Sequence, residues 1–159
     1  MITNGQDSHI SRVLALDVGK KRIGLAVSDE LGLTAQGLET LQRNRIRDDL
    51  SRLDELVKRL NIGTLLVGKP LHMSGDESRQ SEYTREFADR LARQTSVPVV
   101  FWDERLTSAE AERTLRETGA SLDQKKKSVD RLAAMLLLES YLEFRRESMA
   151  TTREDQTDG

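Results

Sequence analysis

The fold is decided by residues 12–29, which read RVLALDVGKKRIGLAVSD. Residues 12–17 are apolar almost throughout and end in an acid, Asp17, which is typical of a buried strand that reaches the edge of a sheet. Residues 23–28 place larger apolar side chains at every second position, which indicates a second strand. Gly19 marks a tight connection between the two strands. The stretch therefore predicts two strands joined by a short turn, with a carboxylate at the turn.

The later part of the chain alternates between helical and strand patterns. Apolar residues recur every three or four positions in the helical stretches, and short apolar runs closed by glycine or polar residues indicate strands. The remaining predicted elements are strands at 34–41, 64–67 and 97–102 and helices at 46–60, 77–94, 107–118 and from Ser128 onward, the last following a Lys-rich loop. The order βββαβαβαα predicts an α/β domain with a mixed five-stranded sheet and helices on both faces.

A chain of 159 residues is the usual size of one domain. We expect the folded domain to cover about 12–146. Residues 1–11 and 147–159 are polar and lack periodic apolar positions, so both segments are predicted to be disordered.

The composition excludes several classes of protein. Acidic and basic residues nearly balance, 27 against 25, so any contact with nucleic acid must come from a local patch. The chain has no cysteine, which excludes disulfides, thiolate zinc sites and a cysteine nucleophile. No apolar run is long enough to span a bilayer, and the first residues lack the pattern of a signal peptide. We therefore expect a cytoplasmic protein without a membrane partner.

Two acids follow predicted strands directly. Asp17 ends the first strand, and Glu104 comes just after the strand at 97–102. Strand ends can lie side by side in a mixed sheet, so the two carboxylates are predicted to converge. Taken singly, Asp17 is also explained as a turn-forming residue, and Glu104 as a solvated acid paired with Arg105.

Asp130 is predicted to lie in the first turn of the last helix. The positive end of the helix dipole would by itself explain an acid there. As the third member of a set with Asp17 and Glu104, it completes a group of hard oxygen ligands of the kind that Mg²⁺ or Mn²⁺ prefers. Such a site suits hydrolysis of a phosphodiester bond, and it needs no side-chain nucleophile.

Basic residues surround these acids in the sequence. Lys20, Lys21 and Arg22 follow Gly19, whose backbone can approach a phosphate closely, and they are predicted to form a phosphate clamp. The other predicted contacts to a nucleic-acid backbone are Lys69, His72, Arg105 and the run from Lys125 and Lys126 to Lys127. The alternative interpretation is a solvated face for the lysine run and an ordinary surface histidine for His72.

Four blocks of the sequence resemble one known family. They are LDVGKKRIGLAVSD at 16–29, VGKPLHMSG at 67–75, WDERLT at 102–107 and VDRLAA at 129–134. In this order they are similar to the signatures of the YqgF family, bacterial Holliday-junction-resolvase-like proteins described as pre-16S rRNA nucleases. The resemblance covers about 12–142, nearly the whole predicted domain.

The resemblance implies a ribonuclease-H-like fold and a cytoplasmic role in maturing the 5′ end of small-subunit ribosomal RNA. It also implies Asp17, Glu104 and Asp130 as metal-binding catalytic acids. The chain departs from the family pattern at Lys69, where a leucine is usual, and near Ser74, where an acid or asparagine is usual. It also lacks a clear fourth acid beside Asp130, which leaves the second metal of related resolvases without an obvious ligand.

Two other functions compete with the RNA nuclease. A Holliday-junction resolvase would use the same acids on branched DNA and would act as a dimer across the two-fold junction, whereas the RNA nuclease is expected to be a monomer, with a homodimer as the alternative. A non-catalytic nucleotide- or nucleic-acid-binding module is the second alternative, because residues 17–19 also resemble the phosphate loop of the actin and hexokinase superfamily. That superfamily closes two lobes over a nucleotide, and this chain has room for one.

Overall fold

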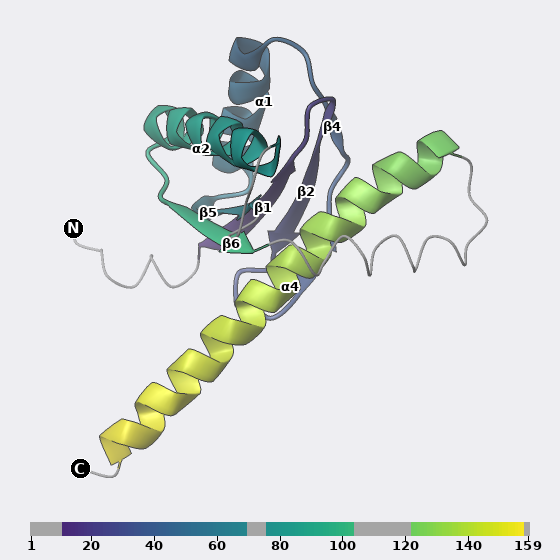
Figure 1. The fold of residues 1–159 in the computed structure, drawn as a ribbon. Helices are drawn as coiled ribbons and strands as arrows, with labels where there is room; N and C mark the ends of the chain where they lie inside the picture. The colour runs from purple at the N-terminus through teal and green to yellow at the C-terminus, as the bar shows by residue number, and fades with distance from the viewer. Residues whose placement is uncertain (1–10, 70–75, 104–121, 158–159) are drawn as a thin grey trace.

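The computed structural model describes residues 11–69, 76–103 and 122–157 (Figure 1). The described elements are β1 (Arg12–Val18), β2 (Arg22–Ser28), β3 (Ala35–Gly37), β4 (Leu41–Gln42), α1 (Ile46–Arg59), β5 (Ile62–Lys69), α2 (Asp76–Thr95), β6 (Val99–Asp103) and α4 (Leu122–Thr157). The predicted α/β architecture is confirmed. The predicted helix at 107–118 lies outside the described residues.

The strands form one mixed sheet in the order β3-β2-β1-β5-β6, and β4 also pairs with β2. β1 and β2 are antiparallel, whereas β1, β5 and β6 run parallel to one another. The single strand predicted at 34–41 is in fact two, because β3 and β4 pair with opposite ends of β2. The described sheet therefore has six strands instead of the predicted five.

Helices cover both faces of this sheet, as predicted. Figure 1 shows α1 and α2 on one side and α4 crossing the other. The side chains of β1 alternate between the two layers, because neighbouring residues in a strand point to opposite faces. Leu14 and Leu16 belong to the core beneath α1 and α2, whereas Val13 and Ala15 belong to the core beneath α4.

The last helix is longer than predicted at both ends. It begins at Leu122 instead of Ser128, so the predicted Lys-rich loop is helical, and it continues to Thr157 instead of ending near 146. No glycine or proline occurs between residues 121 and 158, and the lysines, glutamines and glutamates there are good helix formers. Polar composition was therefore a poor reason to predict a loop and a disordered tail. The domain boundary at 146 stays a prediction.

Figure 1 shows the C-terminal part of α4 extending away from the sheet. Among the described residues, no helix has the length and apolar character needed to cross a membrane.

Candidate active site

Asp17 and Asp130 border the same glycine of the sheet. Asp17 lies opposite Gly24 in the β1–β2 pair, so its side chain points to the same face as a side chain at Gly24 would. A Cβ atom at Gly24 would lie 2.6 Å from the carbonyl carbon of Asp130. The backbone of α4 therefore rests directly on Gly24, and this contact brings Asp130 beside the strand end that carries Asp17.

The carboxylate of Asp130 is paired with Arg22 of β2. The Arg22 Nε donates to Asp130 Oδ2 at 2.7 Å, and each side chain is 23% exposed. The prediction that Asp130 lies in the first turn of its helix is wrong, because α4 begins eight residues earlier, at Leu122. The helix dipole falls off within the first turn, so it does not explain this acid. The partner that stabilises the Asp130 carboxylate is the guanidinium group.

The third predicted acid, Glu104, lies outside the described residues. It follows Asp103, the last residue of β6, and the carboxyl ends of the parallel strands β1, β5 and β6 lie at one edge of the sheet. Trp102, two residues before Glu104, packs on the α4 face, where its ring meets Tyr141 edge to face at 5.4 Å between centroids. Its indole N–H donates to Ser140 of α4 at 3.2 Å.

Within the described ranges, no group of three or more histidine or acidic side chains could hold a metal ion. The described part of the site offers two carboxylates, those of Asp17 and Asp130, next to each other on one face. Carboxylate oxygens are the hard donors that Mg²⁺ and Mn²⁺ prefer. The described donor set therefore fits such an ion in chemistry and needs further ligands to complete it.

The turn after β1 forms a basic wall beside these acids. The Gly19 N–H donates to the Arg22 carbonyl at 2.9 Å, which closes the turn, and Lys20 and Lys21 are exposed on it. An open depression of about 410 Å³ lies against this wall. Its lining residues are Gly19, Lys20, Lys21, Arg22, Gln80 and Asp130. Three predicted phosphate contacts and one predicted acid thus share one hollow.

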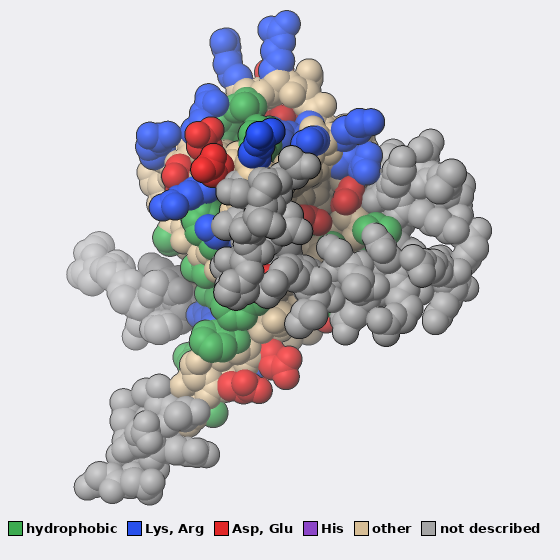
Figure 2. Space-filling view, viewed as in Figure 1, with side chains coloured by type: hydrophobic (Ala, Val, Ile, Leu, Met, Phe, Trp, Pro, Cys, Tyr) green, Lys and Arg blue, Asp and Glu red, His purple; other side chains and the backbone are tan. Residues whose placement is uncertain are grey.

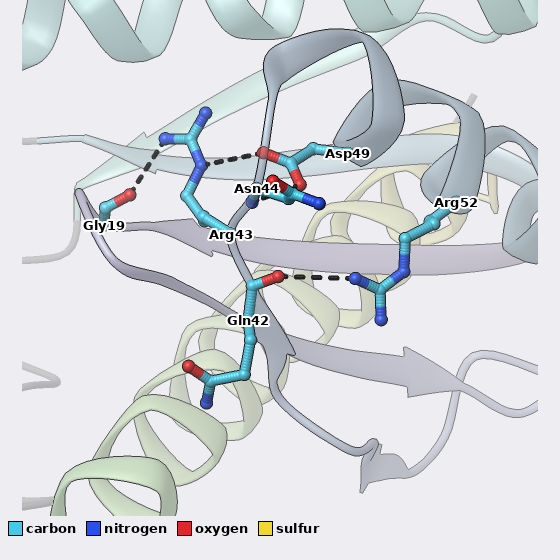
Figure 3. A network of polar contacts seen from close by, with 6 residues as sticks. All are labelled: Gly19, Gln42, Arg43, Asn44, Asp49 and Arg52. Atoms are coloured by element: carbon cyan, nitrogen blue, oxygen red, sulfur yellow. Dashed lines mark hydrogen bonds and ion pairs between the residues drawn. The ribbon is translucent and has the colours of Figure 1, made fainter.

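A buried ion pair behind the turn was missed by the sequence reasoning (Figure 3). Arg43 Nη1 donates to the carbonyl of Gly19 at 3.0 Å, and its Nε donates to Asp49 Oδ2 at 3.2 Å. The two side chains are 5% and 0% exposed. The Asn44 N–H donates to the other Asp49 oxygen at 3.0 Å. The guanidinium also lies over the ring of Phe87, 4.9 Å from its centroid, so the turn is fixed to both α1 and α2.

A second side chain holds the same turn from α2. Gln80 Nε2 donates to the carbonyl of Val18 at 3.2 Å. The two carbonyls that follow Asp17 are thus both held by side chains from other elements. One signal for this arrangement was present in the sequence, because Asp49 lies on the apolar face of α1 between Ile46 and Leu53, where a charge needs a partner.

The structure does not bring every predicted contact to this face. Lys69 lies on the opposite side of the sheet, where its Nζ is 4.7 Å from the ring centroid of Phe101. His72 and Arg105 lie outside the described residues, and Lys125 and Lys126 belong to the first turns of α4. The roles predicted for these residues stay predictions.

Comparison with known proteins identifies the family. Residues 11–144 match the model of the RuvX family, described as Holliday junction resolvase. A protein of Koribacter versatilis named "Putative pre-16S rRNA nuclease" is 50% identical over 134 residues, 84% of this chain and 88% of the relative. Proteins of the same name from Symbiobacterium thermophilum and Geobacillus kaustophilus are 45% and 44% identical, over 84% and 85% of this chain and 93% and 99% of theirs.

Solved structures share the fold at low sequence identity. RuvC of T. thermophilus, in complex with a Holliday junction substrate, matches with a TM-score of 0.56 and 18% identity, over 86% of this chain and 96% of that one. The Fowlpox virus resolvase, in complex with Holliday junction DNA, matches with a TM-score of 0.52 and 15% identity, over 83% and 97% of the two chains. The sheet and its helices are therefore those of the ribonuclease-H-like resolvases, and the chain belongs to the RuvX (YqgF) family.

Proposed function

We propose that this protein is a metal-dependent nuclease that hydrolyses phosphodiester bonds in structured RNA, in the processing of the 5′ end of pre-16S rRNA. One observation carries the proposal: Asp17 and Asp130 both border Gly24, beside a turn that presents Lys20 and Lys21. The names of the curated relatives, which span most of this chain, support the substrate.

Three acids would hold Mg²⁺ or Mn²⁺ in this proposal. Asp17 and Asp130 supply two carboxylates on the α4 face, and Glu104, the first residue after β6, supplies the third. A bound divalent ion lowers the pKa of a water molecule and offsets negative charge on the scissile phosphate.

The chain's own basic residues would place the phosphate. Lys20 and Lys21 are exposed on the wall of the hollow, so their ammonium groups can contact phosphate oxygens without first leaving a protein partner. Arg22 Nε donates to the Asp130 carboxylate at 2.7 Å and fixes its orientation beside the hollow. The clamps from Arg43 and Gln80 keep the turn at a fixed distance from the strand that carries Asp17. Positioning of this kind supplies much of the rate in phosphoryl transfer.

A second candidate function is cleavage of branched DNA. The observation in its favour is the shared fold with two resolvases whose structures contain Holliday junctions. Those matches are 18% and 15% identical, whereas the curated relatives named for pre-16S rRNA reach 50%. The RNA substrate is therefore the better supported of the two. A cytoplasmic location, and a monomer or homodimer as the working form, stay predictions.

The test compares wild type, Asp17→Asn and Asp89→Asn on a precursor fragment that spans the 5′ end of small-subunit rRNA and on a four-way DNA junction, each with Mg²⁺, Mn²⁺ or EDTA. Asp89 is an exposed acid of α2 and serves as the matched control. We expect RNA cleavage that requires the metal, falls by at least ~10²-fold in Asp17→Asn and is unchanged in Asp89→Asn.

Three results would contradict the proposal in different ways. Cleavage of the junction without cleavage of the RNA would identify a resolvase. Equal activity of wild type and Asp17→Asn would remove Asp17 from the mechanism, and binding of RNA without cleavage under any condition would favour a non-catalytic module.

A further inference from the structure

The helix α1 begins with cations where helix stability favours anions. Arg45 is the N-cap residue, in extended conformation and without a side-chain hydrogen bond to the helix, and Arg47 is exposed in the first turn. The N-terminus of a helix carries partial positive charge, so cations there are unfavourable, and the usual N-caps are Ser, Thr, Asp and Asn. The two arginines therefore do not serve the stability of α1.

These arginines lie next to the turn of the candidate site. Gln42 pairs with Arg22 at the start of β2, and the Arg43 N–H then donates to the Lys21 carbonyl at 2.9 Å. The segment that leads into α1 thus runs alongside the turn that carries Lys20 and Lys21. Figure 2 shows blue side chains gathered at the upper end of the molecule, over α1 and the β1–β2 turn.

The four exposed cations, Lys20, Lys21, Arg45 and Arg47, lack acidic partners in the part of the chain that the structure describes. The ion pairs there involve other cations, among them Arg22 with Asp130 and Arg43 with Asp49. Of the two acids in the first turn of α1, Asp49 is fully buried against Arg43, and Asp48 is exposed and offsets one of the four positive charges. The local charge is therefore positive and available to an anionic partner.

We propose that Lys20, Lys21, Arg45 and Arg47 form a basic rim that binds the phosphate backbone of the RNA beyond the bond that is cut. The rim rests on the proposed function for the identity of its partner. Lys20 and Lys21 line the hollow, and the Arg43–Lys21 hydrogen bond joins their turn to the segment that leads into α1, so an RNA strand with one phosphate in the hollow would continue toward the start of α1. Long cationic side chains without fixed partners contact phosphates regardless of base sequence.

The experiment measures binding in EDTA, where a metal-dependent nuclease does not cut. The variants are the double substitution Arg45→Gln with Arg47→Gln and a matched double control, Arg59→Gln with Arg93→Gln. The control removes the same charge from exposed residues in the last turns of α1 and α2. Those turns precede β5 and β6, so they lie at the edge of the sheet opposite the acids.

The probes are a structured fragment of precursor rRNA and a four-way DNA junction of equal phosphate count, each titrated over a series of salt concentrations. Release of counterions makes affinity fall with salt in proportion to the number of phosphate contacts. For the rim variant we expect RNA affinity to fall roughly tenfold for each charge at about 0.1 M salt, and the slope of log affinity against log salt to flatten by about 2. The control should change neither quantity appreciably.

Thermal unfolding separates binding from folding. Removing cations from the positive end of α1 should leave the melting temperature unchanged or raise it, so weaker RNA binding with unchanged or higher stability supports the rim. Equal losses in both double variants, or no loss in the rim variant, would overturn it. A change on the junction without a change on the RNA would overturn the assignment of RNA as the partner.

This test and the test of the proposed function can fail separately. Binding in EDTA does not depend on Asp17, so the rim can stand if Asp17→Asn still cleaves RNA. Conversely, metal-dependent cleavage that Asp17→Asn abolishes would stand even if the rim variant bound RNA like wild type.

Discussion

Two ion pairs flank the same turn, and they differ in burial. Arg43 and Asp49 are 5% and 0% exposed, whereas Arg22 and Asp130 are each 23% exposed. The first pair lies behind the turn, against α2, and has further hydrogen bonds to the carbonyl of Gly19 and to the N–H of Asn44. The second pair lines an open hollow.

The difference in burial indicates which ion pair has a structural role and which can take part in the reaction. A buried carboxylate whose two oxygens are both occupied has no capacity for a new ligand, and losing its partner leaves an uncompensated charge. A carboxylate at the wall of an open hollow can exchange one cation for another at small cost. We therefore interpret Arg43–Asp49 as the support of the site and Arg22–Asp130 as part of its working surface.

The largest effect on stability is expected from Asp49→Ala. This change leaves the guanidinium of Arg43 buried without its counter-charge, and we expect the free energy of unfolding to fall by about 3–5 kcal/mol. Unfolding in urea measures it. The matched control is Asp48→Ala, an exposed acid in the same first turn, for which we expect a loss of about 1 kcal/mol or less. Similar losses in the two variants would show that the buried pair is not a support.

The contact that brings Asp130 to Arg22 is tested by Gly24→Ala. The added methyl group would overlap the backbone of Asp130. Because this backbone can move only if α4 shifts as a whole, we expect the free energy of unfolding to fall by about 1–3 kcal/mol. The control is Gly37→Ala, whose methyl group would meet the Arg131 side chain and the sulfur of Met135 instead of backbone. Those side chains can adjust, so this loss should be smaller. If unfolding in urea showed a larger loss of stability for Gly37→Ala than for Gly24→Ala, the close approach of α4 at Gly24 would not be what positions Asp130.

The partly buried pair Arg22–Asp130 is expected to matter less for stability than Arg43–Asp49 and more for activity. Asp130→Asn should change the free energy of unfolding by no more than about 1 kcal/mol, because the pair is partly solvated. The same variant should lose metal-dependent RNA cleavage by at least ~10²-fold if Asp130 is a ligand. Arg22→Gln is the control, since it breaks the same pair and keeps the acid. A variant Asp130→Asn that cleaves like wild type would make this pair a second structural support.

Much of the fold could be predicted from residues 12–29, because alternation and a glycine turn specify a strand pair locally. The ends of α4 could not be predicted in this way. A polar run such as residues 123–128 is compatible with either a loop or a helix, and its helical state depends on the longer helix that it joins. The same error placed Asp130 in a first turn and assigned its charge to the helix dipole. The actual partner, Arg22, is 108 residues away in the sequence.

The candidate site likewise contains one residue that could be predicted from the sequence and one that could not. Asp17 was predictable as the acid at a strand end, and the structure places it on the α4 face beside Asp130. Arg43 was not predicted, because its part in the site is to hold a backbone carbonyl of another turn, and no spacing rule relates residue 43 to Gly19. Motifs identify groups that touch a substrate more readily than the groups that hold those motifs in place.

The smallest effect is expected at Asp29, an acid held by backbone N–H groups instead of a cation. Its Oδ1 accepts hydrogen bonds from Thr34 at 2.9 Å and Leu33 at 2.7 Å, and the N–H of Thr34 is the main cause that lowers the pKa of Asp29 below its ordinary 3.8. A carboxylate with a lowered pKa in the folded state stabilises the protein above its unfolded pKa, and this contribution disappears as the pH falls through the folded pKa. Asp29→Asn should therefore lower the urea midpoint slightly at neutral pH, and its difference from wild type should shrink as the pH falls below 3.8. Glu30→Gln, at the exposed acid next in the chain, is the control for general charge effects. A difference that grew on acidification would mean that the turn is held without the ionised carboxylate.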